Sequence, residues 1–483
     1  MLILAIETSC DETSLAFLES SFELEMNSEN FVDYINSFEI LAHTISTQIA
    51  THAEYGGVIP EIGARLHAEQ IHYLFVRTVL KAVAKTTHDR HPELASGSPT
   101  TQSKNPNENI IFDFNNPKIR EFLSKIDYIC VTTEPGLKSA LRVGEEFAKT
   151  IQFYLDLKLG KKAEIIAVNH LKGHVFSSFY QVNNYFLVDS AKLSDNGILK
   201  QVQDDGGGLS YVKNTPVEGV KPKVSESLEI TIENEEIPSQ TENEENTKFF
   251  KQTVFPNLHL LVSGGNSQLI LLQNPFELKI IGQTLDDAAG ECFDKTARMF
   301  GLSYPGGVSL AKIAGLDDSN YLNFPVSMKN NPELNFSFSG LKTAVRYFVQ
   351  KNELLNYEEK LSEIELQELL NGDLKTLTTP KPSVSPLQKG YLQPKPKLIL
   401  IKKLCISIQT VIVEQLIIKV KKAIKEHKPN SIGISGGVSA NRLLRQKIQE
   451  IADGKSIFIP DLNLTGDNAV MIGLAGAVIT KNQ

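Results

Sequence analysis

The sequence predicts a mixed α/β protein built from two lobes. Its 483 residues are too many for one compact hydrophobic core. Apolar runs of strand length are interspersed with helical patterns. In each half of the chain, two such runs flank a short polar turn and form a hairpin. These observations indicate two or more lobes, with one such hairpin in each half of the chain.

The first hairpin spans 1–18. An apolar strand leads into the acidic turn Glu7–Thr13, and a second strand follows. Its tip offers backbone N–H groups, hydroxyls and the carboxylate of Asp11, although an ordinary hairpin with polar turn residues has the same pattern. The second hairpin, Leu258–Leu272, has a Ser-Gly-Gly turn. Two such tips, one per half, are what an actin-like ATPase fold uses to hold phosphates from two lobes.

Strand–turn–helix units lie between the hairpins. A loop rich in glycine, His52–Glu61, leads into a helix expected from Ile62 to about Val83. The strand Ile126–Thr132 ends in a Pro-Gly turn, and a helix then runs to about Leu157. Free N–H groups at the start of such a helix favour an anion.

The second half continues with helical patterns. Leu285–Phe300 has one charged face, for which a solvated face with local ion pairs is the plain interpretation. A long amphipathic helix is expected from Leu398 to about His427, and its basic end is expected to serve the helix dipole rather than RNA. Ser431–Arg445 predicts a strand, a Gly-Gly turn and a helix whose start suits adenosine or phosphate.

Two histidines form the clearest candidate site. Ala163–Asn169 reads as a strand, and His170 and His174 follow on a helix. Residues four apart share one helical face, so both imidazoles can reach one metal ion. The alternative is two surface histidines that share a face. Near the C-terminus, Asp467 precedes an apolar helix, and capping that helix is its plain role.

Composition and charge limit the partners and the cellular compartment that we expect for the protein. The net charge of −8 means that a nucleic-acid partner must use a local basic patch. No run of about eighteen apolar residues predicts a membrane span. The first residues enter a strand directly, without a basic leader, and the cysteines are scattered singly. We therefore expect a reduced, cytoplasmic protein.

Three segments read as insertions because of their composition. Residues 85–124 are rich in Thr, Ser, Asn, Pro and His. Residues 182–251 contain a glutamate cluster and few aromatics, and are expected to be at least partly disordered. Residues 352–397 combine a charged helix with a Thr/Pro/Lys tract.

Taken together, the motifs resemble those of the TsaD family of tRNA N(6)-threonylcarbamoyladenosine transferases. They occur in family order and, with the insertions excepted, cover about three quarters of the chain. The motifs are Ile6–Thr13, His52–Glu61, His170 with His174, Val262–Gly265, Asp286–Gly290, Phe293–Lys295, Tyr304–Gly307, Phe336–Lys342, Gly436–Asn441 and Thr465–Ala469. Two positions depart from common family patterns: Glu134 replaces a glycine before Pro-Gly-Leu, and Asn266 stands where many bacterial members have histidine.

The resemblance implies a two-lobed actin-like (ASKHA) fold with a central interlobe cleft. The N-terminal lobe would comprise 1–165 and 470–483, and the C-terminal lobe 166–469. It also implies one divalent metal, with iron favoured and zinc as the alternative, held by His170, His174 and Asp467. The implied adenylate-binding residues are Leu261, Val262, Ser263, Gly264, Gly265, Asp294, Gly307 and Asn441.

The implied reaction is transfer of threonylcarbamoyl from its adenylate to the adenosine 3′ of the anticodon in tRNAs reading ANN codons. TsaB-type and TsaE-type proteins are the implied partners. Asp11 or Glu12 is our hypothesis for the group that accepts the proton. The rival interpretations are a metal-dependent O-carbamoyltransferase and a regulatory or chaperone ATPase of the same fold.

Overall fold

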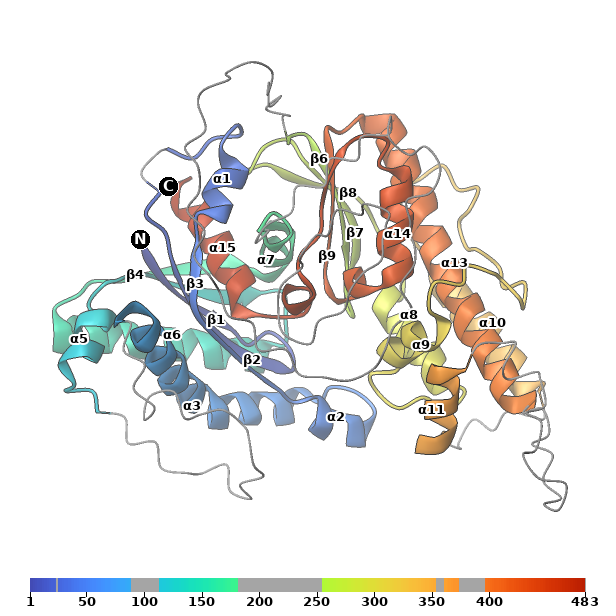
Figure 1. The fold of residues 1–483 in the computed structure, drawn as a ribbon, viewed down its shortest axis with the longest axis horizontal. Helices are drawn as coiled ribbons and strands as arrows, with labels where there is room; N and C mark the ends of the chain where they lie inside the picture. The colour runs from blue at the N-terminus through green and yellow to red at the C-terminus, as the bar shows by residue number, and fades with distance from the viewer. Residues whose placement is uncertain (23–24, 88–112, 181–253, 353–359, 373–395, 483) are drawn as a thin grey trace, which may run out of the picture. The chain divides into compact units, whose positions relative to one another are not determined.

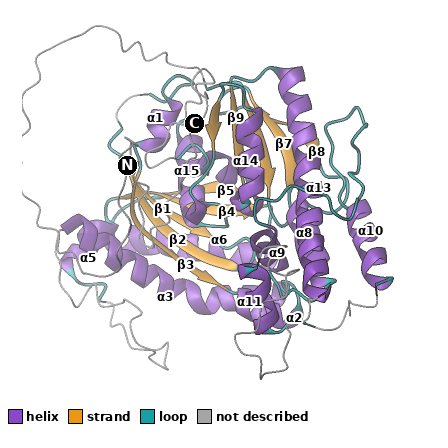
Figure 2. Cartoon of the chain, turned by 45° about the vertical axis from the view of Figure 1, so that its right-hand side comes forward, coloured by secondary structure: helices purple, strands orange, loops and turns teal. Residues whose placement is uncertain are grey.

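Two five-stranded sheets of the same topology organise the chain (Figures 1 and 2). The computed structural model describes residues 1–22, 25–87, 113–180, 254–352, 360–372 and 396–482, all within one compact unit. The strand orders are β3-β2-β1-β4-β5 and β8-β7-β6-β9-β10. In each sheet, three antiparallel strands are extended by two parallel ones. The predicted α/β repeat is therefore confirmed.

The first sheet is built on its central strand. The strands are β1 (Leu2–Glu7), β2 (Glu12–Glu19), β3 (Glu39–Thr47), β4 (Ile126–Glu134) and β5 (Glu164–Asn169). Every residue of β1 is buried, because helices cover both faces of the sheet. On one face pack α3 (Pro60–Thr87), α5 (Pro117–Leu123) and α6 (Lys138–Leu159), and on the other α1 (Phe31–Asn36), α7 (His170–Ser177) and α15 (Ala469–Thr480).

The second sheet repeats this plan. Its strands are β6 (Asn257–Val262), β7 (Ser267–Leu272), β8 (Leu278–Gln283), β9 (Ser431–Ser435) and β10 (Ser456–Phe458). One face packs against the helices α8 (Ala289–Arg298), α9 (Gly306–Ala314), α10 (Ser339–Gln350), α11 (Glu363–Asn371), α13 (Pro396–His427) and α14 (Arg442–Ile451). The other face shares a hydrophobic core with α7, α15 and the first sheet, through residues such as Leu261 and Ile270.

Several helices begin at other residues in the structure than the sequence predicted. His52 lies in a short helix, α2 (Ile49–Tyr55), rather than in a loop, and the following helix starts at Pro60. Residues 117–123 of the first predicted insertion form α5, because Asn116 caps it and its Ile119 and Phe122 enter the core. The charged helix begins only at Ala289.

The remaining parts of the three predicted insertions lie mostly outside the described residues. This holds for all of 182–251, for much of 85–124 and for most of 352–397, apart from α11. The lobe boundaries at 165/166 and 469/470 stay predictions. Among the described helices, none is both long and apolar enough to cross a membrane.

Candidate metal centre and nucleotide site

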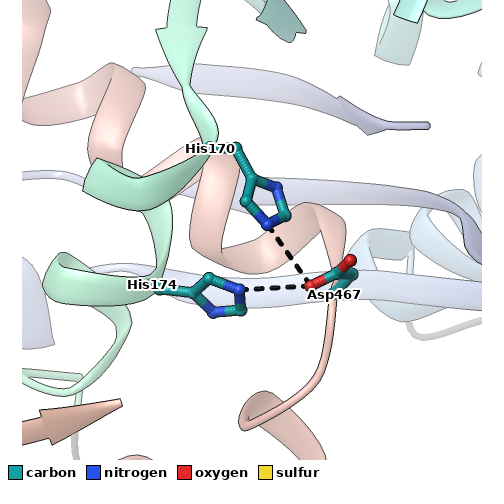
Figure 3. A group of neighbouring side chains, drawn as sticks. All are labelled: His170, His174 and Asp467. Atoms are coloured by element: carbon teal, nitrogen blue, oxygen red, sulfur yellow. Dashed lines mark hydrogen bonds and ion pairs between the residues drawn. The ribbon is translucent and has the colours of Figure 1, made fainter. Parts of the chain in front are cut away.

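Two histidines and one aspartate converge at the start of α7 (Figure 3). β5 leads directly into α7, and the side chain of Asn169 caps the helix by accepting from the backbone N of Leu171 at 3.0 Å. This cap places His170 at the first helical position and His174 one turn later. The Nε2 atoms of the two histidines lie 3.4 and 3.1 Å, respectively, from the same Oδ1 atom of Asp467.

Asp467 does not cap the helix that follows it. Asn468 is the N-cap of α15 and accepts from the backbone N of Met471 at 3.0 Å. The expectation that Asp467 serves as this cap is therefore wrong. The amide of Asn468 also donates to the carbonyl oxygen of Gly466 at 2.8 Å and so fixes the turn that carries Asp467. The Asp467 carboxylate is left to face the histidines.

The cluster fits a divalent metal ion. One atom from each of the three residues can serve as a ligand, and these atoms all lie within 4.8 Å of one another. Two imidazoles and one carboxylate are a common donor set for zinc and for iron. Burial acts to raise the pKa of Asp467, but His170 and His174 lower it more, so that pKa lies well below its usual range. The carboxylate is therefore ionised, as metal binding requires.

The acidic tip of the first hairpin lies nearby and is held rigidly. The backbone N of Gln48 donates to the carbonyl oxygen of Asp11 at 2.8 Å. The ring of the buried His67 bridges the tip, because Nε2 lies 3.0 Å from the carbonyl oxygen of Cys10 and Nδ1 lies 2.7 Å from the Thr13 hydroxyl. No pattern in the sequence points to His67, although the residue comes soon after the His52–Glu61 motif.

The two acidic residues at this tip differ. Burial raises the pKa of Glu12 to about 9, and the negative charges of Asp11 and Asp467 act in the same direction. A carboxyl group that keeps its proton at neutral pH cannot accept another. Asp11, the other candidate for proton acceptor, is 8% exposed.

The Ser-Gly-Gly turn of the second hairpin adjoins two glycine-containing segments. The backbone N of Gly290, at the start of α8, donates to the carbonyl oxygen of Ser263 at 3.2 Å. A Cβ atom at Gly290 would lie 2.6 Å from that oxygen, so the approach requires glycine. Gly436 has a φ of 85° and packs against the carbonyl of Val262. The backbone around Ser263 is thus fixed by close contacts, whereas Gly264 is exposed.

The structure also brings Asp294 and Gly307 together. The Oδ1 atom of Asp294 accepts from the backbone N of Gly307 at 2.7 Å, which joins α8 to the start of α9. Burial raises the pKa of Asp294, and the N–H groups of Gly307 and Gly306 oppose this shift only in part. The charge of Asp11 adds to the increase, so the acidic tip of the first hairpin is electrostatically coupled to α8.

Three other predicted nucleotide-site residues have structural partners of their own. Asn441 accepts from the backbone N of Leu444 at 3.0 Å as the cap of α14, and its amide donates to Gln409 at 2.8 Å. The side chains of Leu261 and Val262 are fully buried in the hydrophobic cores. The side chains of these residues are therefore engaged within the protein.

Two charged features make contacts within the protein, and Lys419 differs from the expectation, because it contacts a loop rather than the end of its own helix. Asp287 forms an ion pair with Lys295 at 2.9 Å and another with Lys342, and these charges lower its pKa although burial acts to raise it. Lys419, in the basic part of α13, is buried and donates to the carbonyl oxygens of Asn331 and Glu333 at 3.1 and 2.6 Å.

The repeated sheet and the histidine–aspartate cluster define an actin-like (ASKHA) protein with a candidate metal centre. The chain belongs to the TsaD family: the profile described as "tRNA N6-adenosine threonylcarbamoyltransferase" matches residues 39–89, 118–192 and 240–474. It is accordingly an enzyme of the transferase class.

Relatives named tRNA N6-adenosine threonylcarbamoyltransferase match over nearly the whole chain. The protein from Thermosipho africanus is 30% identical over 483 residues, which is 100% of this chain and 95% of the relative. The protein from Francisella philomiragia is 30% identical over 480 residues, with 99% and 94% covered. The protein from Christiangramia forsetii is 29% identical over 479 residues, with 98% and 92% covered.

Proposed function

We propose that the protein transfers the threonylcarbamoyl group from threonylcarbamoyl-AMP to the exocyclic amine of the adenosine 3′ of the anticodon in tRNAs reading ANN codons, with release of AMP. The convergence of His170, His174 and Asp467 beside an acidic hairpin tip, in a chain of the TsaD family, carries this proposal. The names of the relatives support the transferred group and the tRNA acceptor.

The three converging residues would hold one divalent metal, with iron favoured and zinc as the alternative. A metal bound there supplies Lewis-acid stabilisation of charge on the transferred acyl group. The role of the chain is to keep both Nε2 atoms and the Asp467 carboxylate aimed at one point. Burial helps to hold the two imidazoles in this position, because His174 has no exposed surface and His170 is only 7% exposed.

The turn Ser263–Gly265 and the start of α8 would bind the adenylate. Backbone N–H groups at an exposed glycine turn are suited to a phosphate, because no side chain blocks the approach. Asp294 would accept from ribose hydroxyls with the oxygen that Gly307 does not occupy. Leu261, Val262 and Asn441 would fix this geometry from the core, as their buried contacts suggest.

Asp11 would accept the proton from the attacking amine. The exocyclic amine of adenine is a weak base, so orientation of the two substrates matters more than proton removal. Transfer forms a nitrogen–carbonyl bond, breaks the bond between the acyl carbon and the phosphate oxygen, and releases AMP with its charge on that oxygen. Glu12 would stay protonated and donate rather than accept.

The proposed setting is the cytoplasm, with a TsaB-type helper and a TsaE-type ATPase as partners. The test is reconstitution with those partners, an adenylate synthase, labelled threonine, bicarbonate, ATP and an ANN-decoding tRNA. Label should enter RNA only when this protein is present. A tRNA with guanosine 3′ of its anticodon is the matched control and should stay unlabelled. Label transferred to a small molecule, or steady ATP turnover by this protein alone without any acceptor, would contradict the proposal.

A further inference from the structure

A buried carboxylate lies directly behind the candidate metal centre. Glu7 is the last residue of β1, the central strand of the first sheet, and has no exposed surface. Among the described residues, neither Lys nor Arg forms an ion pair with it, and its one ion-pair partner is His170. Burial of a carboxyl group is costly unless hydrogen bonds and an oppositely charged partner compensate for the lost water, so its position directly against His170 calls for an explanation.

The orientation of the Glu7 carboxylate is fixed from two sides. Its Oε1 atom accepts from the backbone N of Ser9 at 2.5 Å, and its Oε2 atom accepts from the Thr132 hydroxyl at 2.5 Å. Ser9 lies in the turn that follows β1, and Thr132 lies near the end of β4 in the same sheet. The carboxylate therefore cannot rotate away without the loss of two buried hydrogen bonds.

The same Oε2 atom faces the back of a predicted metal ligand. It lies 3.2 Å from Nδ1 of His170, and the Ser9 hydroxyl lies 3.1 Å from that nitrogen. The opposite ring nitrogen, Nε2, faces Asp467. A proton on Nδ1 satisfies the carboxylate and leaves the lone pair of Nε2 free, which is the form of imidazole that binds a metal through Nε2.

His174 has no such support. Its Nδ1 atom has no hydrogen-bond partner among the described residues, and its ring is held by packing alone on that side. The two histidines are therefore not equivalent: one is oriented by a hydrogen-bonded carboxylate and the other by the surrounding core.

We propose that Glu7 is the positioning residue of the centre, which fixes His170 with its proton on Nδ1 and its Nε2 atom directed at the metal. The inference rests on the proposed function in one respect, namely that a metal ion binds at the cluster. It predicts that the charge of Glu7 contributes to metal affinity although Glu7 is not a ligand.

The test measures metal binding by the full chain after chelator treatment. Zn²⁺ affinity is determined by competition with a chromogenic chelator, and the geometry by the visible spectrum of the Co²⁺-loaded protein. Glu7→Gln keeps the size of the side chain and should weaken Zn²⁺ binding about 10–100-fold and alter the Co²⁺ bands. The matched control is Thr8→Val, at the residue next to Glu7 in the chain. This substitution removes a buried hydrogen bond from the Thr8 hydroxyl to the Ala140 carbonyl, and it should change neither the Zn²⁺ affinity nor the Co²⁺ spectrum.

Two outcomes overturn the inference and are distinct from each other. Unchanged Zn²⁺ affinity and Co²⁺ bands in a folded Glu7→Gln variant would remove the role of Glu7 and leave the metal centre intact. Failure of the wild-type chain to bind metal would remove the centre and the inference together. If Glu7→Gln does not fold, nitrogen-15 spectra of histidine-labelled, Zn²⁺-loaded wild-type protein decide: His170 protonated on Nδ1 supports the proposal, and His170 bound to the metal through Nδ1 overturns it.

Discussion

The Nε2 atom of His174 lies 3.1 Å from Oδ1 of Asp467, although 293 positions separate the two residues. Packing between α7 and α15 produces this proximity. Gly173 lies at this contact, where a Cβ atom would lie 3.0 Å from the Cδ1 atom of Ile472 and 3.4 Å from the carbonyl oxygen of Met471. The site therefore depends on a helix pair made from the middle and the end of the chain.

Asp467→Asn should abolish stoichiometric metal binding. The substitution keeps the size of the side chain but removes the negative charge that the two imidazoles share, so we expect metal content to fall from about one ion per chain to a small fraction of that. Mass spectrometry of metal in the purified protein measures the change. Asp461→Asn, in the preceding loop and with an exposed side chain, is the control and should retain the ion.

Asp11→Asn should slow threonylcarbamoyl transfer about 100-fold without a change in metal affinity, because it removes a proton acceptor but no ligand. Glu12→Gln should have a smaller effect, since the pKa of Glu12 is already raised to about 9 and its carboxyl is neutral at the assay pH. Single-turnover rates and Zn²⁺ titrations of both variants provide the comparison. Loss of metal from Asp11→Asn would show that the residue acts structurally.

Gly264→Ala should separate nucleotide binding from folding. No heavy atom of the described protein lies within 4 Å of a Cβ atom built at Gly264, so the melting temperature should stay the same. If a phosphate lies against this turn, the added methyl group should weaken AMP binding about tenfold or more in calorimetric titration. Gly290→Ala is the contrasting variant: its Cβ atom would lie 2.6 Å from the Ser263 carbonyl oxygen, so it should lower the melting temperature. Unchanged AMP affinity in Gly264→Ala would place the phosphate elsewhere.

Acid should destabilise the first sheet through His43. Burial lowers the pKa of His43 to about 4, and Lys81 adds to this effect. The unfolded chain, with a histidine pKa of about 6.5, binds the proton first, so the contribution of His43 is fully present above about pH 6.5 and is lost as the pH falls towards 4. At pH 5 the loss is about 2 kcal/mol.

The measurement is urea unfolding of the metal-free protein at pH 7.5 and pH 5. His43→Gln cannot be protonated and can still bond to the Ser14 hydroxyl, which lies 3.0 Å from Nε2 in the wild type. The variant should therefore lose less stability than the wild type between the two pH values. An equal loss in both proteins would show that His43 is not the group responsible.

The sequence predicted those elements whose signal is local. The buried strand β1 appears as an apolar run because both of its faces are covered, and β4 and β6 are recognisable because their central residues are mainly apolar. The edge strand β8 has an exposed, mixed pattern and was not predicted. β3, at the corresponding edge of the first sheet, was missed for the same reason.

By itself, then, the sequence determined the two hairpin tips, the shared helical face of His170 and His174, and the motif order that indicates the family. Only the tertiary structure decided that Asn468 caps α15 while Asp467 turns to the histidines, and that Glu7 stands behind His170. The physical reason is range: helix and strand periodicity arises between close neighbours in the chain, whereas these contacts arise where β1, α7 and α15 pack around one core.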